Sequence, residues 1–229
     1  MEAIILAGGF GTRLRSVVSD VPKPMAPVAG RPFLELLLSS LKAKGITRAI
    51  LSVGYMSEVI TAHFEKHPVG IDLVYEIESR PLGTGGAIAA ALQRATCDHL
   101  FVFNGDTYLD LDLRAVAAMW PGDCTPIIVA RSVADTKRFG RLEFADGRIS
   151  RFSGNGEDGA GVVNAGSYLI PSNVFTGVSL PSVFSFEQDF LARRPPMSLR
   201  AFVTDGHFID IGVPEDLRRA QVELAGLVK

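Results

Sequence analysis

Residues 8–14 combine three glycines with an arginine directly after a short apolar segment. They read Gly8, Gly9, Phe10, Gly11, Thr12, Arg13 and Leu14, and Lys23 follows between two prolines. Glycines let backbone N–H groups approach an anion because no Cβ blocks the way, and the two cations suit phosphate. No Gly-Lys-Ser/Thr closes the loop as in a P-loop, and Leu14 stands where a dinucleotide fingerprint needs its third glycine. We therefore expect a phosphate-binding loop of another kind; the alternative is a tight turn with solvated charges.

Two aspartates end apolar runs that are typical of buried strands. Asp106 follows Asn104 and Gly105, and Asp210 lies within residues 208–212. A carboxylate among apolar neighbours is costly unless a partner offsets its charge, and Mg²⁺ prefers carboxylate and phosphate oxygens. The pair therefore predicts a metal site that faces a nucleotide's phosphates. The alternative for Asp210 is a carboxylate satisfied by nearby backbone N–H groups.

Residues 81–87 form a second glycine-rich loop, which leads into a helix. In a parallel sheet, ligands bind beyond the carboxyl ends of the strands, so this loop, the first loop and Asp106 should converge. Backbone without Cβ atoms admits a planar base and can read its edge, and Thr84 adds a hydroxyl. Close packing at a helix N-terminus explains the glycines equally well.

The elements that must position these residues alternate between strand and helix in the first half of the chain. Short apolar runs predict strands at residues 3–7, 48–53, 71–77 and 100–103, and longer periodic runs predict helices at 33–44, 57–67 and 87–95. In the second half we expect strands at 127–130, 141–144, 148–152, 162–170, 199–203 and 208–211, and helices at 185–194 and from residue 214 onward. Asp112 should cap a further helix, and Asp146-Gly147 should turn a hairpin. This order predicts an α/β protein, a Rossmann-like three-layer α/β/α sandwich around a mostly parallel mixed sheet, in one domain spanning residues 1–229.

Composition excludes several classes of protein. The chain has 229 residues, of which 47% are apolar, and a formal charge of −2. These values argue against disorder, nucleic-acid binding and association with an anionic membrane. No apolar run approaches the ~20 residues that span a bilayer, and the two cysteines, Cys97 and Cys124, are far apart. We expect a cytoplasmic protein that binds small molecules.

These motifs resemble the sugar-1-phosphate nucleotidyltransferases over essentially the whole chain. The sequence GGFGTRL followed by PKPM (residues 22–25) is highly specific for that family, and residues 81–87, 104–106 and Asp210 occur in the expected order. The resemblance implies the nucleotide-diphospho-sugar transferase fold, Mg²⁺ as cofactor, an NTP and a sugar 1-phosphate as substrates, and a monomer or homodimer. Its halves, about 1–120 and 121–229, would bind nucleotide and sugar phosphate respectively. Within the family, residues 33–35, 164–166, 184–187 and 208–216 look most like guanylyltransferases acting on a heptose 1-phosphate, which implies GTP and a product, GDP-heptose, for surface polysaccharides.

The resemblance also implies roles for individual residues. Nucleotide binding is expected of Leu6, Ala7, Gly8, Gly9, Gly11, Thr12, Arg13, Lys23, Gly83, Thr84, Asn104 and Gly105. Arg13, Lys23 and Asp106 are the expected catalytic residues, and Asp106 and Asp210 the metal ligands. Asn164, Gly166 and Glu187 are expected to face the sugar. The chain departs from the family where many relatives carry Glu-Lys after the hairpin, because Gly154-Asn155 stands there; Arg151 or Arg141 is the expected replacement cation.

Three other functions remain open at this stage. The first is uridylyl or thymidylyl transfer to another hexose or muramate 1-phosphate, because backbone groups that read a base discriminate weakly between bases. The second is a catalytically silent nucleotide-sugar sensor, which the missing Glu-Lys favours and the intact cations and aspartates disfavour. The third, a dinucleotide-dependent oxidoreductase, is disfavoured by Leu14.

Overall fold

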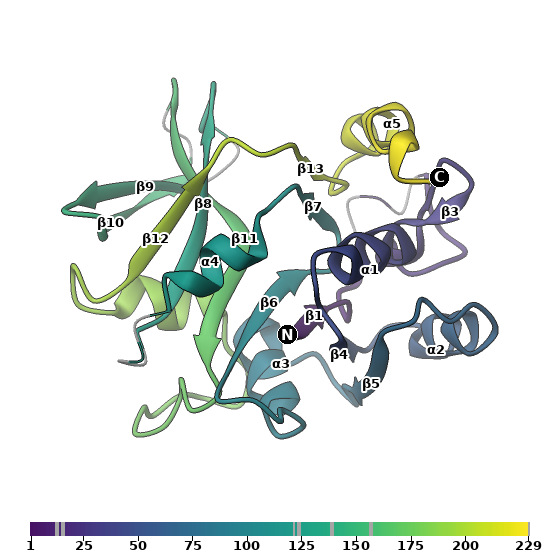
Figure 1. Ribbon diagram of the computed structural model, residues 1–229, viewed down its shortest axis with the longest axis horizontal. Helices are drawn as coiled ribbons and strands as arrows, with labels where there is room; N and C mark the ends of the chain where they lie inside the picture. The colour runs from purple at the N-terminus through teal and green to yellow at the C-terminus, as the bar shows by residue number, and fades with distance from the viewer. Residues whose placement is uncertain are drawn as a thin grey trace.

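A mixed sheet forms the centre of the protein (Figure 1). The computed structural model describes residues 1–11, 14, 17–120, 122, 125–137, 140–155 and 158–228. Within these residues the sheet has nine strands in the order β5-β4-β1-β6-β11-β8-β12-β10-β9. The strands are β1 (Glu2–Leu6), β4 (Arg48–Val53), β5 (Asp72–Ile77), β6 (His99–Asn104), β8 (Ile127–Val133), β9 (Gly140–Ala145), β10 (Arg148–Asn155), β11 (Gly161–Pro171) and β12 (Arg200–Thr204).

Helices and two small ribbons surround this sheet. The helices are α1 (Phe33–Ala43), α2 (Ser57–Lys66), α3 (Gly83–Leu92), α4 (Leu113–Ala118) and α5 (Pro214–Glu223), with shorter helical turns at Lys23–Met25, Phe186–Phe190, Leu191–Arg193 and Ala225–Val228. One ribbon pairs β2 (Pro27–Val28) with β3 (Arg31–Pro32), and the other pairs β7 (Thr107–Leu109) with β13 (Phe208–Asp210). Among the described residues no helix is both long enough and apolar enough to cross a membrane.

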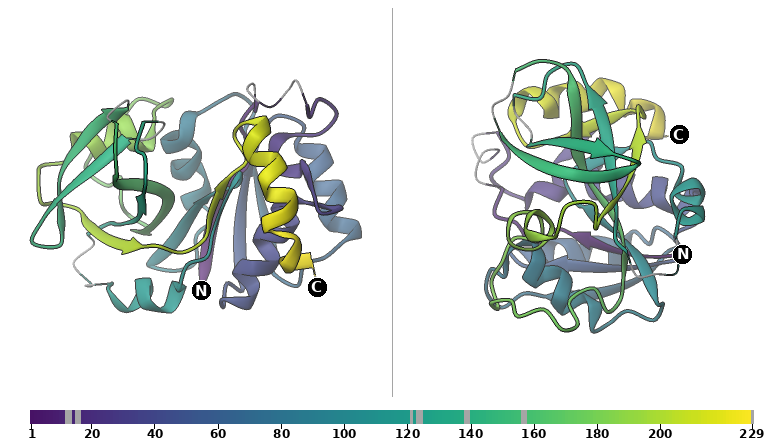
Figure 2. Two further views of the ribbon diagram at one scale, coloured as in Figure 1. Left: turned by 90° about the horizontal axis from the view of Figure 1, so that it is seen from above. Right: turned by 90° about the vertical axis from the view of Figure 1, so that its left-hand side faces the viewer.

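The expected three layers form because alternate side chains of each strand point to opposite faces of the sheet. In β1, Ala3 and Ile5 belong to one apolar cluster and Ile4 to another, because successive side chains point to opposite faces. The first cluster includes the buried faces of α1, α2, α4 and α5, and the second includes α3 and the Phe186–Phe190 turn. Accordingly, α3 lies on the opposite side of the strands from α4 and α5 (Figure 2, left).

Parallel pairing is less extensive than we expected. Strands β5, β4, β1 and β6 are parallel to one another, and so are β8 and β12. However, β11 runs antiparallel to β6 and β8, and β10 runs antiparallel to β12 and β9. One antiparallel pair, β9–β10, is the predicted hairpin, whose turn residues Asp146 and Gly147 have φ of 51° and 70°. The other antiparallel pairings named here join strands that are far apart in the chain.

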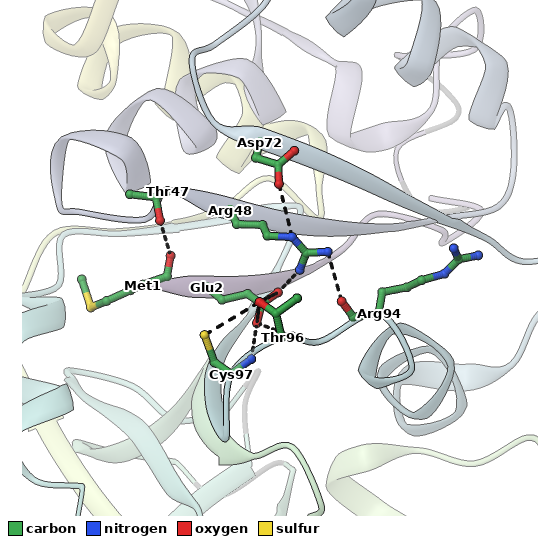
Figure 3. Close-up of polar contacts among 8 residues, drawn as sticks. All are labelled: Met1, Glu2, Thr47, Arg48, Asp72, Arg94, Thr96 and Cys97. Carbon is green, nitrogen blue, oxygen red and sulfur yellow. Dashed lines mark hydrogen bonds and ion pairs between the residues drawn. The ribbon is translucent and has the colours of Figure 1, made fainter.

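The N-terminal end of the parallel strands is held by a buried carboxylate (Figure 3). Glu2 forms an ion pair with Arg48 and accepts hydrogen bonds from the N–H groups of Thr96 (3.0 Å) and Cys97 (3.1 Å). Arg48 also contacts Asp72 (3.2 Å) at the start of β5. Three neighbouring strands and the segment after α3 are therefore joined at this end of the sheet.

Candidate active site

A cavity of about 410 Å³ opens at the carboxyl ends of β1 and β6, between the two glycine-rich loops. Nine of the expected nucleotide-binding residues line it: Leu6, Ala7, Gly8, Gly9, Gly11, Lys23, Gly83, Thr84 and Asn104. Asp106 lines it as well. Thr12 and Arg13 lie outside the described residues. The structure therefore brings the two loops and the first aspartate together, as the parallel strand order predicts.

Lys23 lies between the two predicted metal-binding carboxylates. Its ammonium group forms an ion pair with Asp106, and Nζ is 3.8 Å from Asp210 Oδ1. The Lys23 side chain is only 10% exposed, whereas the two aspartates are 32% and 25% exposed. Gly11 permits this placement because its φ is +57° and a Cβ there would lie 2.7 Å from the Lys23 Cβ. The first loop and the proline-flanked lysine therefore form one unit.

The β7–β13 ribbon brings the two aspartates together across a hundred residues of sequence. Asp210 pairs with Thr107 in this ribbon, and the Ile211 N–H donates to the Asp106 carbonyl (3.0 Å). Thr107 Oγ1 donates to Asp106 Oδ1 (3.2 Å). Backbone pairing in the ribbon therefore brings the two aspartates to neighbouring positions.

Asn104 and Gly105 connect the end of β6 to the first loop. The Gly105 N–H donates to the Leu6 carbonyl (2.8 Å), and a Cβ at Gly105 would lie 2.7 Å from that oxygen. On the other side, the amide of Asn104 lies against Gly166, whose φ is +66°. Asn104 therefore separates the cavity from the residues expected to face the sugar.

The glycines of the second loop allow it to pack closely against residues 182–184. The Gly85 N–H donates to the Phe184 carbonyl (2.9 Å), and a Cβ at Gly83 would lie 2.5 Å from the same oxygen. A Cβ at Gly86 would meet the Ser182 carbonyl at 2.8 Å. Helix α3 consequently begins at Gly83, four residues before the predicted start, because the glycines form its first turn.

A hydrogen-bonded network joins this loop to the expected sugar-facing residues. Thr84 Oγ1 donates to Glu187 Oε2 (2.8 Å), and buried Tyr168 donates its hydroxyl to Glu187 Oε1 (3.0 Å). Asn164 Nδ2 donates to the same hydroxyl (2.8 Å), and the Gly166 N–H donates to Asn164 Oδ1 (3.0 Å). Burial and the Glu187 charge raise the pKa of Tyr168 well above its usual range, so the hydroxyl remains a donor.

The candidate replacement cations lie elsewhere. Arg151 is 67% exposed on β10, with Nη1 3.6 Å from Glu143 Oε1 on β9. Arg141 donates a hydrogen bond to the Ala160 carbonyl. Neither arginine lines the cavity, so the structure does not bring them to the nucleotide end of the site.

Among the described residues that line the cavity, one charged residue, Glu78, was not predicted from the sequence. Glu78 follows β5 and lines the cavity beside Gly8. Glu78 follows a predicted strand, but an acid at a strand end has many ordinary explanations, so the sequence alone does not single it out.

Comparisons with known proteins identify the family. The family model described as nucleotidyl transferase matches residues 2–225. The chain belongs to this nucleotidyl transferase family. It is therefore an enzyme, and its three-layer fold is the nucleotide-diphospho-sugar transferase fold.

Two relatives resemble this nucleotidyltransferase over nearly their whole length. The D-glycero-alpha-D-manno-heptose 1-phosphate guanylyltransferase of Aneurinibacillus thermoaerophilus is 42% identical, over 98% of each chain. The crystal structure of HddC from Yersinia pseudotuberculosis complexed with GMP-PN is 38% identical, with a TM-score of 0.86 over 96% of this chain and 97% of that one. The mannose-1-phosphate guanylyltransferase of Mycobacterium tuberculosis is 32% identical over 98% of this chain, which covers 64% of the longer relative.

Proposed function

We propose that this nucleotidyltransferase transfers the guanylyl group of GTP to D-glycero-α-D-manno-heptose 1-phosphate, forming GDP-heptose and pyrophosphate. Two kinds of support combine. The relative at 42% identity carries this activity in its name, and the HddC structure contains a guanine nucleotide analogue. The observation that carries the proposal is the convergence of Lys23, Asp106 and Asp210, of which Lys23 and Asp106 line the glycine-rich cavity.

In this reaction an oxygen of the sugar phosphate attacks the α-phosphorus of GTP, and the bond to the pyrophosphate oxygen breaks. A phosphate monoester has a second pKa of about 6 and is already a dianion at neutral pH, so no general base has to remove a proton. The barrier comes from mutual repulsion of the two phosphates and from charge on the transferring group. On this proposal Lys23 neutralises the α-phosphate, the N–H groups of residues 8–11 hold the triphosphate, and Arg13 neutralises the leaving pyrophosphate.

The carboxylate pair has the right chemistry for Mg²⁺. Both aspartates approach one cationic group, Lys23 Nζ, so the site already accommodates positive charge between them. Mg²⁺ typically uses one or two carboxylates and completes its six oxygens with phosphate and water. We propose Asp106 and Asp210 as its ligands; when bound, the ion would withdraw charge from the transferring phosphoryl group.

On the acceptor side we propose that Asn164, Gly166 and Glu187 contact the sugar. Their network stands directly behind Asn104 and Thr84, which line the nucleotide cavity. We further propose that the enzyme works in the cytoplasm, where GTP is available and exposed Cys97 would stay reduced, as a monomer or homodimer.

Pyrophosphate release tests this proposal directly. GTP, UTP, dTTP, CTP and ATP would each be supplied with the heptose 1-phosphate, with mannose 1-phosphate and with glucose 1-phosphate. We expect release above background only with GTP, and the highest kcat/KM with the heptose acceptor. Turnover with UTP or dTTP instead would favour the uridylyl or thymidylyl alternative, and saturable GTP binding without any release would favour a silent sensor.

A further inference from the structure

The hydroxyl group of Thr84 is already committed to two partners on the acceptor side of the site. Besides donating to Glu187 Oε2 (2.8 Å), Thr84 Oγ1 accepts a hydrogen bond from the Phe186 N–H (2.8 Å). A hydroxyl group has one proton and two lone pairs, so the Thr84 side chain keeps one acceptor position and no donor. A base in the cavity therefore cannot receive a hydrogen bond from this hydroxyl group unless the contact with Glu187 breaks.

Two backbone hydrogen bonds hold the second loop against the segment that carries Glu187. The Phe184 N–H donates to the Leu82 carbonyl (3.1 Å), and the Gly85 N–H donates to the Phe184 carbonyl (2.9 Å). Neither bond involves the Thr84 side chain, so both remain when the hydroxyl group is removed. What the hydroxyl group adds is a fixed position of the Glu187 carboxylate relative to the loop.

The Glu187 carboxylate is held by hydroxyl groups. Thr84 and Ser185 donate to Oε2 (2.8 and 3.1 Å), and Tyr168 donates to Oε1 (3.0 Å). In the part of the chain that the structure describes, no lysine or arginine forms an ion pair with it. Each carboxylate oxygen accepts about two hydrogen bonds, so Oε2 is filled and Oε1 can accept from one further donor. A sugar hydroxyl group is such a donor.

We propose that Thr84 is a positioning residue for the sugar 1-phosphate: its hydroxyl group holds Oε2 of Glu187 so that Oε1 accepts from one hydroxyl group of the sugar. This inference rests on the contact between Glu187 and the sugar proposed above. It differs from the role that the family resemblance implies for Thr84, which is contact with the base. Thr84 lines the nucleotide cavity, but its side chain serves the acceptor.

Replacing Thr84 by Val removes the hydroxyl group and keeps the size of the side chain. With GTP saturating, KM for the heptose 1-phosphate should rise by about 10–100-fold, the range for one hydrogen bond to a charged acceptor. KM for GTP, measured with saturating heptose 1-phosphate, should change little. Thr84→Ser restores the hydroxyl group and should restore KM for the sugar phosphate. A rise in KM for GTP alone would show that the hydroxyl group serves the base, and would overturn the proposal.

A double-variant cycle with Glu187→Ala separates positioning from a general loss of structure. If Thr84 acts through the Glu187 carboxylate, Thr84→Val should not raise KM for the sugar phosphate further once that carboxylate is absent. A purely structural role would raise this KM by the same factor in both backgrounds, and that result would overturn the proposal. Pyrophosphate release gives the kinetic constants, and thermal unfolding checks that each variant is folded.

The matched control is Thr61→Val. Thr61 lies on α2, where its hydroxyl group donates to the Glu58 carbonyl (3.2 Å), so neither KM should change. If Glu187→Ala leaves KM for the sugar phosphate unchanged, the proposed acceptor contact fails together with this inference. If Glu187→Ala raises that KM but Thr84→Val does not, only the assignment of Thr84 fails.

Discussion

At the scale of single residues, the contact between Lys23 and Asp106 joins the first glycine-rich loop to the proposed metal-binding pair. Replacing Asp106 by Asn keeps the size of the side chain but removes its charge, so the proposed metal ligand and the partner of Lys23 are lost together. We expect kcat to fall by about 10²–10³-fold or more, comparable with the loss of one group that stabilises transition-state charge. Pyrophosphate release measures this loss, and thermal unfolding checks that the fold is intact.

The control for this variant is Asp110→Asn. Asp110 is 63% exposed and binds Lys44 at the surface (2.6 Å), so its replacement should leave kcat unchanged. Full activity of the Asp106→Asn enzyme would contradict the proposal that Asp106 binds a catalytic metal.

Most cavity residues could be predicted from the sequence, through the glycines, Lys23 and Asp106 and through the family resemblance that these motifs carry. Glu78 could not, because a glutamate after a strand carries no such signal until its neighbours in space are known. The sequence also left the second loop undecided between base binding and packing. Contacts of Gly83 and Gly85 with Phe184 show the packing role, and these contacts link segments a hundred residues apart.

At the scale of elements, Tyr168 connects strand β11 with the Phe186–Phe190 turn. Tyr168→Phe removes the hydroxyl that holds both Glu187 Oε1 and Asn164 Nδ2. Loss of this hydroxyl leaves Glu187 and Asn164 each without one hydrogen-bond partner, so we expect the free energy of unfolding to fall by about 1–3 kcal/mol. If Glu187 and Asn164 face the sugar, KM for the sugar phosphate should also rise by about 5–150-fold, the same free energy expressed in binding, while KM for GTP should change little.

Steady-state kinetics with each substrate varied in turn separates these effects. Tyr75→Phe is the control, because Tyr75 is a partly buried tyrosine of the edge strand β5 away from this network, and neither KM should respond to its replacement. A less stable Tyr168→Phe enzyme with an unchanged KM for the sugar phosphate would show that the network is only structural.

Elements with a clear pattern were predicted well, and short or irregular ones were not. Strand β4 and helix α1 match their predicted ranges within one residue, and Asp112 caps α4 as expected, accepting from the Arg114 (3.0 Å) and Ala115 (3.1 Å) N–H groups. The β7–β13 ribbon was only half anticipated: residues 208–211 read as a strand, but three-residue β7 is too short to show a period. Nevertheless this ribbon brings the proposed metal ligands, Asp106 and Asp210, together.

At the scale of the whole molecule, the proposed catalytic residues and a buried stabilising ion pair lie at opposite ends of the parallel strands. The carboxyl ends carry the cavity, whereas the amino ends carry the Glu2–Arg48 cluster, about 13–16 Å away along five-residue β1. The three layers followed from the sequence because alternating strands and helices allow few arrangements. The antiparallel half did not, because the pairing of β11 with both β6 and β8 depends on contacts between segments far apart in the chain.

This separation predicts that stability can be lowered without loss of catalysis. In Arg48→Met the Glu2 carboxylate, only 2% exposed, would lose its ion pair and keep only the N–H and hydroxyl donors of residues 96–97. Removing one partner of such a pair should lower the free energy of unfolding by about 2–4 kcal/mol and the melting temperature by about 5–15 °C. Arg218→Met removes an exposed pair with Glu215 (3.1 Å), and this control should change stability by less than about 0.5 kcal/mol.

Combining Arg48→Met with Glu2→Gln removes the uncompensated charge, so the double variant should recover part of the lost stability. Below its unfolding temperature each variant should retain the kcat/KM of the unmodified enzyme, because none of these side chains reaches the cavity. Denaturant unfolding gives the free energies, and pyrophosphate release at a temperature where every variant is folded gives the activities. If folded Arg48→Met loses activity, the two ends of the sheet are coupled, and the Glu2–Arg48 cluster also helps to position the catalytic loops.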